Sequence, residues 1–315
     1  MKVAVVGAGL AGLAVSWYLS QSPECSVTLF DPKGIAKGAS GISTGLLHPF
    51  PGRRALRSWS ATEGIEETLH LIGVSEKALG CLVAEKSGIF RPAVTEQQKE
   101  DFFKRSQKDS EAIWQEHPRF GIGLWIPKGI TLYSRLYLQG LWKGCENRGV
   151  KLVQERISNL ASLQQFDQIV LTMGFESLQI IPNLPLEVTK GQTILCRIKE
   201  RLPFSLVSLG HITPTEDPAL CQIGSTYERA YQSLEPTQDV ILDLKQKITP
   251  FYPEADALEV IEIRAGCRIS RPYGYRPIME KIDPKTWVFT GLGSRGMLYH
   301  AMCGKKIAEL IKASQ

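Results

Sequence analysis

The chain has 315 residues, of which 43% are hydrophobic and 22% are charged, and it carries a formal net charge of +5. This length can form two domains of ordinary size with their own cores, and the composition is typical of a soluble globular protein. The mild positive charge is spread without a long basic run, so it does not by itself indicate nucleic acid, and it does not exclude an anionic partner.

The seven cysteines are scattered and form no C-x-x-C pair, which argues against a metal site and favours reduced, buried or half-buried thiols. No apolar run is long enough to span a membrane, and the chain opens directly into an apolar strand with no room for a cleaved signal. We therefore expect a cytoplasmic protein, at most peripheral to a membrane, with no membrane span and no bound metal.

The first line of the chain carries the most specific motif. Residues 3–6 form a short apolar run typical of a buried parallel strand, and a G-x-G-x-x-G sequence follows over residues 7–12. Apolar residues then recur at helical spacing, and residues 27–30 predict a second strand that ends at Asp31. Strand, glycine turn, helix, second strand and acid therefore follow the order of a dinucleotide-binding unit.

Each residue of this motif has a physical role. Gly7 allows the tight turn out of the strand, Gly9 lets the backbone approach a pyrophosphate, and Gly12 allows close packing of helix on strand. The pyrophosphate is expected at the helix N-terminus, and Asp31 accepts hydrogen bonds from ribose hydroxyls while repelling a 2′-phosphate. The motif predicts an adenine dinucleotide, either FAD or NAD.

The segment after Asp31, residues 32–49, is rich in glycine, serine and threonine and contains Lys37. Such a loop can surround phosphate groups with backbone donors and hydroxyls, although a plain surface loop has the same composition. Further along, the patterns predict helices over residues 55–72 (ended by Gly73), 99–111, 132–147 (capped by Gly149), 239–250 and 298–311, and strands over residues 82–84, 89–91, 150–153, 193–198, 220–223 and 258–263.

Two later segments repeat the sequence of strand and glycine turn. Residues 168–171 predict a buried strand that ends in Thr172-Met173-Gly174, and residues 287–290 predict a strand followed by the glycine-rich residues 291–297. Three separated glycine turns on one sheet imply a discontinuous α/β, Rossmann-like nucleotide domain with a strand-rich α+β domain inserted between its pieces, and a ligand at their interface. The expected nucleotide domain comprises residues 1–75, 132–186 and 264–315, and the expected substrate domain comprises residues 76–131 and 187–263.

These motifs resemble the FAD-dependent D-amino acid oxidase superfamily, on its glycine and sarcosine oxidase side. The resemblance rests on the 7–12 motif with Asp31, the loop over residues 37–41, and the phrases at 171–174, 265–268 and 291–296. The phrases Gly224-Ser-Thr-Tyr-Glu228 and Gly291-Leu-Gly-Ser-Arg-Gly296 are most similar to the FAD domain of bacterial bifunctional enzymes that modify the wobble uridine of tRNA. Residues 60–130 resemble nothing we can name.

The resemblance implies a noncovalent FAD. A covalent link through His48, which some relatives have, lacks a matching local pattern here. Residues Arg295, Gly296 and Met297 would present N–H groups at a helix N-terminus to the pyrimidine end of the flavin. The residues expected to hold FAD are Gly7, Gly9, Leu10, Ala11, Gly12, Asp31, Pro32, Lys37, Ala39, Ser40, Gly41, Gly45, Leu46, Leu47, Val153, Thr172, Met173, Gly174, Gly293, Ser294, Arg295, Gly296 and Met297, with His48 at the flavin face.

The resemblance also implies a substrate site. Arg268 matches the arginine that binds the substrate carboxylate through its planar guanidinium, although Arg264, Arg271 and Arg276 lie nearby and a surface role stays open. His211 stands where glycine oxidases have a substrate-contacting tyrosine, and a structural histidine is an equal alternative. Tyr227 and Arg91 are further candidates; a buried aromatic role for Tyr227 is the alternative.

The implied reaction removes a hydride from the glycine-type Cα of an N-substituted glycine and gives glyoxylate and a free amine. The substrate is then a small amine or the carboxymethylaminomethyl group of a uridine in tRNA, with tRNA as the partner and no DNA. The alternatives are oxidation of free glycine, sarcosine or D-amino acids, and a non-catalytic flavin-binding RNA or partner module. The electron acceptor and the oligomeric state stay open.

Overall fold

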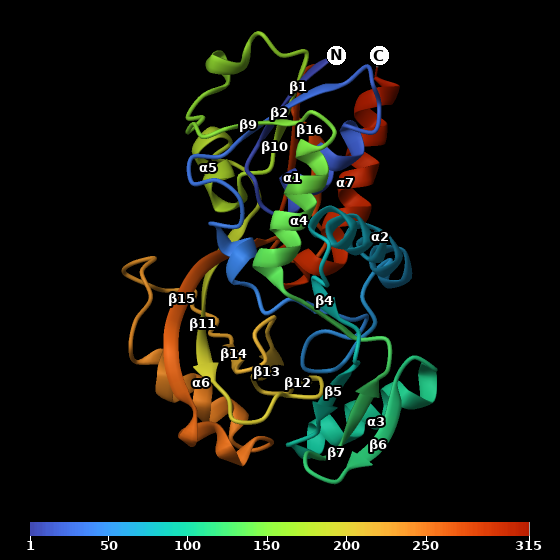
Figure 1. The fold of residues 1–315 in the computed structure, drawn as a ribbon, viewed down its shortest axis with the longest axis vertical. Helices are drawn as coiled ribbons and strands as arrows, with labels where there is room; N and C mark the ends of the chain where they lie inside the picture. Colours follow the sequence, from blue (N-terminus) through green and yellow to red (C-terminus); the bar gives the residue numbers. More distant parts are fainter. Residues whose placement is uncertain (315) are drawn as a thin grey trace.

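The computed structural model describes residues 1–314, which form two stacked parts, each built around one large sheet (Figure 1). The six-stranded sheet lies at the end of the molecule that carries both termini, and the eight-stranded sheet lies at the opposite end (Figure 1). The mixed α/β architecture with a strand-rich second part agrees with the sequence prediction.

The six-stranded sheet contains the glycine-turn segments. Its order is β16-β17-β10-β1-β2-β9, and all neighbours are parallel except the antiparallel pair β16 and β17. The apolar runs of the central strands are buried because helices or loops cover both faces, as a parallel sheet requires. The strands are β1 (Lys2–Val6), β2 (Ser26–Phe30), β9 (Lys151–Val153), β10 (Gln168–Leu171), β16 (Ile278–Lys281) and β17 (Thr286–Thr290).

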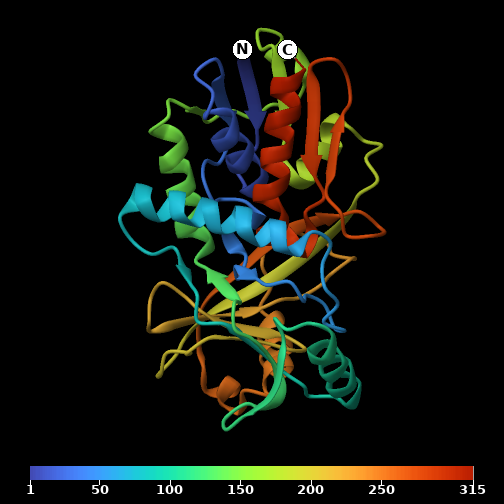
Figure 2. The ribbon, with the colours of Figure 1, turned by 90° about the vertical axis from the view of Figure 1, so that its right-hand side faces the viewer.

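Helices cover one face of this sheet in a layer that Figure 2 shows from the side. Helices α1 (Leu10–Leu19), α4 (Ser134–Glu146) and α7 (Gly296–Ala313) pack on it, and α2 (Ala61–Leu79) crosses against α4 and α7. Their buried side chains form the largest apolar core, and each fully buried leucine or isoleucine contributes about 1.5–3 kcal/mol. A second core, to which the short α5 (Ser177–Ile180) contributes, covers the opposite face.

The eight-stranded sheet has the order β15-β11-β14-β13-β12-β5-β7-β6 and is antiparallel except between β12 and β5. Helices α3 (Glu96–Lys108) and α6 (Val240–Ile248) bury its outer face in two separate apolar cores. Its strands are β5 (Ile89–Pro92), β6 (Ile113–His117), β7 (Gly121–Ile126), β11 (Glu187–Arg197), β12 (Ser205–Val207), β13 (His211–Pro214), β14 (Leu220–Gly224) and β15 (Glu259–Ser270). A small third sheet consists of β3 (Leu46–Leu47), β8 (Ile130–Leu132) and β4 (Ala84–Glu85).

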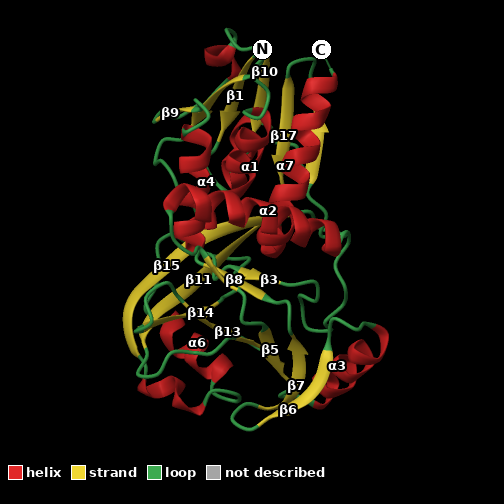
Figure 3. Cartoon of the chain, turned by 45° about the vertical axis from the view of Figure 1, so that its right-hand side comes forward, coloured by secondary structure: helices red, strands yellow, loops and turns green. Residues whose placement is uncertain are grey.

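Two long strands connect the two parts. Strands β11 and β15 pair over their whole lengths, with one bulge at Leu195/Cys196, and rise from the lower sheet to the helices above (Figure 3). Their register places Gly191 opposite Gly266 and Thr189 opposite Arg268. These upper ends therefore lie where the two parts of the molecule meet.

Some predicted elements differ from the structure. The helix expected over residues 55–72 is α2, which begins at Ala61 and continues through Gly73 to Leu79. Gly73 lies inside α2 and does not have the left-handed backbone that ends a helix. The helix ends at Gly80, which has a φ of 73°. The helix expected over residues 99–111 lies at Glu96–Lys108, where Thr95 caps the N–H of Gln98.

The expected domain boundaries stay a prediction, and three of them fall inside elements. The boundary at 75/76 cuts α2, the boundary at 131/132 cuts β8, and the boundary at 263/264 cuts β15. The expectation of buried or half-buried thiols is wrong for Cys81, which is exposed. Of the helices between residues 1 and 314, none combines the length and apolar character needed to cross a membrane.

Candidate active site

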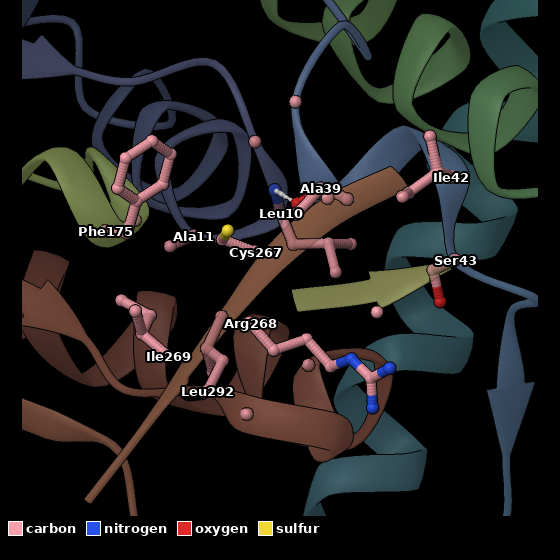
Figure 4. Close-up of a pocket in the computed structure, with 18 of the residues that line it drawn as sticks. Leu10, Ala11, Ala39, Ile42, Ser43, Phe175, Cys267, Arg268, Ile269 and Leu292 are labelled. Carbon is pink, nitrogen blue, oxygen red and sulfur yellow. Dashed lines mark hydrogen bonds between the residues drawn. The ribbon is translucent and has the colours of Figure 1, made fainter. Parts of the chain in front are cut away.

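A cavity of about 620 Å³ lies where the two parts meet. The carboxyl ends of β1, β2, β10 and β17 form one wall, and β15 with its neighbours forms the other. Gly9, Ser40 and Gly296, which belong to three distant segments of the chain, all line this cavity, as the sequence predicts. Figure 4 shows Arg268 extending into it from β15.

The first glycine turn has the geometry expected of a dinucleotide site. Gly7 has φ of 109° and donates its N–H to Phe30 O at 2.7 Å, which turns the chain sharply out of β1. A Cβ on Gly12 would lie 1.8 Å from Gly7 O, so only glycine permits this close packing of α1. At the tip of α1, Leu10 N donates to Ser40 Oγ at 3.2 Å (Figure 4).

Asp31 is fixed at the end of β2. One carboxylate oxygen accepts the N–H of Ala8 at 2.9 Å, and the other accepts the N–H groups of Lys33 at 2.9 Å and Gly34 at 3.0 Å. These bonds hold the acid beside the glycine turn and leave it on the cavity wall. Its lone pairs are more numerous than these three bonds, so it can also accept from hydroxyl groups of a ligand.

The glycine turns after β10 and β17 also face the cavity. Thr172 Oγ1 donates to Val6 O at 2.8 Å and joins the end of β10 to the first turn. Gly293 has φ of 55°, and α7 then begins at Gly296 with Arg295 as its N-cap and no side-chain cap. The N–H groups of its first turn therefore have no side-chain partner at the cap and face the cavity, which favours a ligand with partial negative charge there.

These residues fit FAD. The N-termini of α1 and α7 have no side-chain hydrogen bond at the cap residue, and both open into one cavity. Their free N–H groups can bind a pyrophosphate and the electron-rich edge of a flavin ring. A Cβ on Gly9 would lie 2.9 Å from Ser40 Oγ, so the backbone stays open to a close ligand. His48 Nδ1 is buried on the cavity wall without a hydrogen-bond partner among residues 1–314. Buried polar atoms normally have a partner, so a bound ligand is expected to supply one here.

Arg268 provides the main positive charge on the substrate side. Its Nη2 donates to Ser225 Oγ at 3.0 Å and to Thr226 O at 2.7 Å, and its Cζ lies 5.6 Å from the Tyr227 ring centre. No carboxylate lies within ion-pair distance of it among the described residues. Burial lowers the pKa of Arg268, with Tyr227 and Glu228 opposing that effect, and a guanidinium stays charged in any case.

The guanidinium is accommodated by Gly191, the strand neighbour that the sequence analysis missed. A Cβ at Gly191 would lie 1.9 Å from Arg268 Nη2, so a larger residue would displace the arginine. A glycine inside a strand is the signal that could have found it, because such a glycine marks a close approach of another group.

Two histidines in the cavity wall are neutral. Burial, aided by the charge of Arg268, lowers the pKa of His211 to about 3, and its Nε2 lies 2.9 Å from Thr44 Oγ1. Burial, aided by Arg91, lowers the pKa of His48 to about 3 as well. Neither imidazole therefore competes with Arg268 as a cation at neutral pH.

Most of the other predicted residues also line the cavity. They are Leu10, Ala11, Pro32, Lys37, Ala39, Leu46, Met173, Gly174, Ser294 and Met297.

Several predicted residues lie outside the cavity wall and act on its frame. Gly41 and Gly45 each permit a tight turn, because a Cβ there would lie 2.0 Å from Ala36 O or 1.9 Å from Leu132 O. Leu47 is a buried core residue, and Val153 O accepts the N–H of Asp31 at 3.2 Å. Their assignment as cofactor contacts stays a prediction.

The two remaining substrate candidates, Tyr227 and Arg91, also do not line the cavity. The alternative of a buried aromatic is wrong for Tyr227, which is 55% exposed and reaches the site only through Arg268. Arg91 is fully buried beneath the cavity, where it donates to the carbonyls of Phe50 and Gly52 and stacks on Phe102. It therefore supports the 50–52 loop instead of facing a substrate.

The sequence analysis missed further wall residues. Thr44 and Ser225 contact His211 and Arg268; Ser225 belongs to the phrase at 224–228 that carries the family resemblance, and Thr44 lies in the glycine-, serine- and threonine-rich segment 32–49. Ile42, Arg156 and Phe175 line the cavity from segments without a local signal. Their positions follow only from the way the loops fold back over the sheet.

The two-part fold, the parallel sheet with its glycine turns and the enclosed cavity define a dinucleotide-binding oxidoreductase architecture. The model of the family "DAO: FAD dependent oxidoreductase" matches residues 2–310. The chain therefore belongs to this family, and FAD is its cofactor.

Relatives agree with this assignment. The chain is 24% identical over 383 aligned residues to the tRNA 5-methylaminomethyl-2-thiouridine biosynthesis bifunctional protein MnmC of Leptospira borgpetersenii, which covers 98% of this chain and 56% of that protein. It is 23% identical over 315 residues to the glycine oxidase of Pseudomonas putida, covering 87% and 84% of the two chains. The chain thus spans about half the length of the bifunctional relatives, and both resemblances inferred from sequence are confirmed.

Solved structures share the fold. A glycine oxidase from Bacillus cereus superposes with a TM-score of 0.84 at 19% identity, covering 100% of this chain and 95% of that one. An iminodiacetate oxidase from Chelativorans gives 0.82 at 18% identity, covering 99% and 95%. These likenesses confirm the predicted fold class.

Proposed function

We propose that this FAD-dependent oxidoreductase oxidises the glycine-type carbon of an N-substituted glycine. The observation that carries the proposal is the Arg268 guanidinium, which extends into the cavity without a carboxylate partner among the described residues. An unpaired guanidinium on an enclosed wall favours a ligand that brings its own carboxylate.

The chain's own residues then bind and orient the substrate. Arg268 anchors the carboxylate, while Ser225 and Thr226 hold one end of the guanidinium so that its other nitrogens face the cavity. His211 stays neutral beside Thr44, so the site keeps one fixed cation. Such positioning, rather than a strong protein base, is the main contribution that this wall can make.

The reaction balances without a metal. FAD, when bound, would accept the hydride, a proton with two electrons, that the substrate carbon loses. The substrate nitrogen loses a proton, and the resulting imine takes up water to give glyoxylate and the free amine. The first turns of α1 and α7 would hold the cofactor on the wall opposite Arg268.

The similarity to the bifunctional tRNA-modifying protein and to a glycine oxidase supports this substrate class. The bifunctional relatives favour an N-substituted glycine carried by a uridine of tRNA. The glycine oxidase favours the alternative, oxidation of free glycine, sarcosine or D-amino acids. A non-catalytic flavin-binding module is the other alternative, and the replacement of a substrate-contacting tyrosine by His211 is the feature that keeps it open.

An anaerobic reduction panel tests the proposal. FAD-loaded protein is mixed under nitrogen with tRNA bearing carboxymethylaminomethyl-uridine, with unmodified tRNA, and with glycine, sarcosine or D-alanine, and the flavin absorbance is followed. Bleaching by modified tRNA, but not by unmodified tRNA, glycine or sarcosine, is expected. Bleaching by free amino acids alone would favour the alternative substrates, and no bleaching by any amine would favour the non-catalytic module.

A further inference from the structure

Two exposed segments border the cavity and share an unusual composition. Residues 51–60 lead into α2, and residues 271–277 join β15 to β16; neither contains an acidic residue. Both can be followed in Figure 2, where the orange-red loop after β15 projects beside the blue segment that leads into α2. We call their exposed rings and unpaired cations, together with the adjoining N-cap of α7, the arginine–tyrosine rim: Arg53, Arg54, Trp59, Tyr273, Tyr275, Arg276 and Arg295.

The rings of this rim are exposed to an extent that folding does not explain. Tyr273 is 89% exposed and Tyr275 is 57% exposed, so neither contributes much buried area to a core. Trp59 is 37% exposed and rests on the buried Tyr299, with ring centres 5.8 Å apart. Contiguous exposed aromatic surface of this kind marks a binding surface.

Two of the four rim arginines are stacked on rings, and none of the four is paired with an acid among the described residues. Arg295 Cζ lies 4.4 Å from the Tyr275 ring centre, and Arg276 Cζ lies 5.0 Å from that of Trp59. Within residues 1–314, none of the four rim arginines forms an ion pair, whereas the neighbouring Arg57 and Arg271 do. A guanidinium stacked on a ring keeps its N–H groups pointing outward in its plane, where phosphate oxygens can accept them.

The rim is continuous with the active-site cavity. Arg295 lines the cavity at the start of α7, and Pro51 and Gly52 line it just before Arg53. A substrate group inside the cavity would therefore leave any larger molecule attached to it lying across these rings and guanidinium groups.

We propose that the arginine–tyrosine rim binds single-stranded nucleotides of an RNA whose modified nucleoside places its amine in the cavity. This inference rests on the proposed function and selects the RNA-borne substrate. Alternating rings and guanidinium groups match unstacked bases and their phosphates, which is how single-stranded nucleic acid is bound. A free amino acid would have no use for a surface outside the cavity. A membrane would favour exposed aliphatic groups, of which these segments offer Leu56 alone.

RNA binding by the FAD-loaded full chain tests the inference. The probe is a fluorescein-labelled anticodon stem-loop RNA with an unpaired loop, and binding is followed by anisotropy over a range of salt concentrations. Tyr273→Ala is expected to weaken binding about 5- to 100-fold through loss of one stacked base. Arg276→Ala is expected to reduce the slope of log K against log salt by about 0.7. Arg148→Ala is the matched control, because Arg148 stacks on Trp17 at 5.1 Å outside the cavity and the rim.

Separate readouts distinguish failure of the rim from failure of the function. Tyr273→Ala should leave anaerobic flavin reduction by the free carboxymethylaminomethyl-uridine nucleoside unchanged, because its ring is outside the cavity wall. Unchanged RNA affinity and salt slope in both rim variants, with normal flavin reduction, would overturn the rim and leave the proposed function intact. Absence of reduction by every amine, with rim-dependent RNA binding, would overturn the proposed function and support the rim as an RNA surface. Binding to phosphatidylglycerol vesicles without binding to RNA would overturn the inference in favour of a membrane.

Discussion

Replacing Arg268 by alanine should weaken substrate binding far more than it changes any other property of the site. In the structure, Nη2 of Arg268 is used by Ser225 and Thr226, whereas its Nε and Nη1 have no hydrogen-bond partner among the described residues. Each of these two nitrogens can donate a separate charge-assisted hydrogen bond to a carboxylate oxygen. Loss of that contact costs about 2–4 kcal/mol, which corresponds to an apparent Kd roughly 30- to 700-fold higher.

The assay is anaerobic stopped-flow reduction of the bound flavin over a range of substrate concentrations. The concentration dependence gives the apparent Kd and the limiting rate, and retention of bound FAD shows that the cofactor site is intact. Arg268→Lys should recover only part of the affinity, because an ammonium group is a point charge that lacks the planar, oriented set of donors of the guanidinium.

Arg264→Ala is the matched control on the same strand. Arg264 lies two positions from Gly266, is largely buried, and is paired with Glu262 at 2.6 Å instead of facing the cavity. Its replacement should leave the apparent Kd within about twofold, a change below 0.5 kcal/mol. An Arg268→Ala enzyme with an unchanged Kd, or a control that loses as much affinity as Arg268→Ala, would remove Arg268 from the substrate site.

Three further outcomes are expected. Gly9→Val should lower FAD affinity at least about tenfold, measured by equilibrium dialysis, because a side chain would obstruct the backbone where the pyrophosphate is expected; normal FAD binding would contradict the site. Gly12→Ala should lower the free energy of unfolding by about 1–3 kcal/mol or more in urea, because its Cβ meets Gly7 O, whereas Gly73→Ala should be neutral or stabilise the protein by up to about 1 kcal/mol. Burial lowers the pKa of His48 and of His211 to about 3, below the usual 6.5, so the unfolded chain binds more protons and stability falls as pH drops from about 6.5 towards 3. Each histidine contributes up to about 1.4 kcal/mol per pH unit in that range, and urea midpoints that stay constant from pH 7 to pH 5 would contradict this.

The nucleotide-binding half of the fold could be predicted because its signals are local. The glycine spacing, the buried strand and Asp31 are adjacent in sequence, and each has one physical role that survives in the structure. The convergence of three glycine turns could also be predicted, because carboxyl ends of parallel strands meet at one edge of a sheet.

The features that the sequence did not predict depend on contacts between distant segments of the chain. Strands β6 and β7 were missed because β6 is partly exposed along its length and shows no clean alternation. The sequence predicts a helix end at Gly73, but α2 continues to Leu79 because Ser75 and Leu79 pack against Gly140 of α4, a contact between distant segments. A glycine within the β11 pattern indicates a close approach of another group, but only the structure shows that this group is the Arg268 guanidinium.

The long strand β15 has a consequence for how the enzyme can move. Gly266 contacts the cofactor loop, since a Cβ there would lie 2.7 Å from Ile42, and Arg268 stands two residues further along the same strand. Two residues of extended chain span about 6.6 Å whatever the rest of the molecule does. Whatever the motion between the two halves, the backbone of Arg268 therefore keeps its distance from the point where β15 meets the cofactor loop.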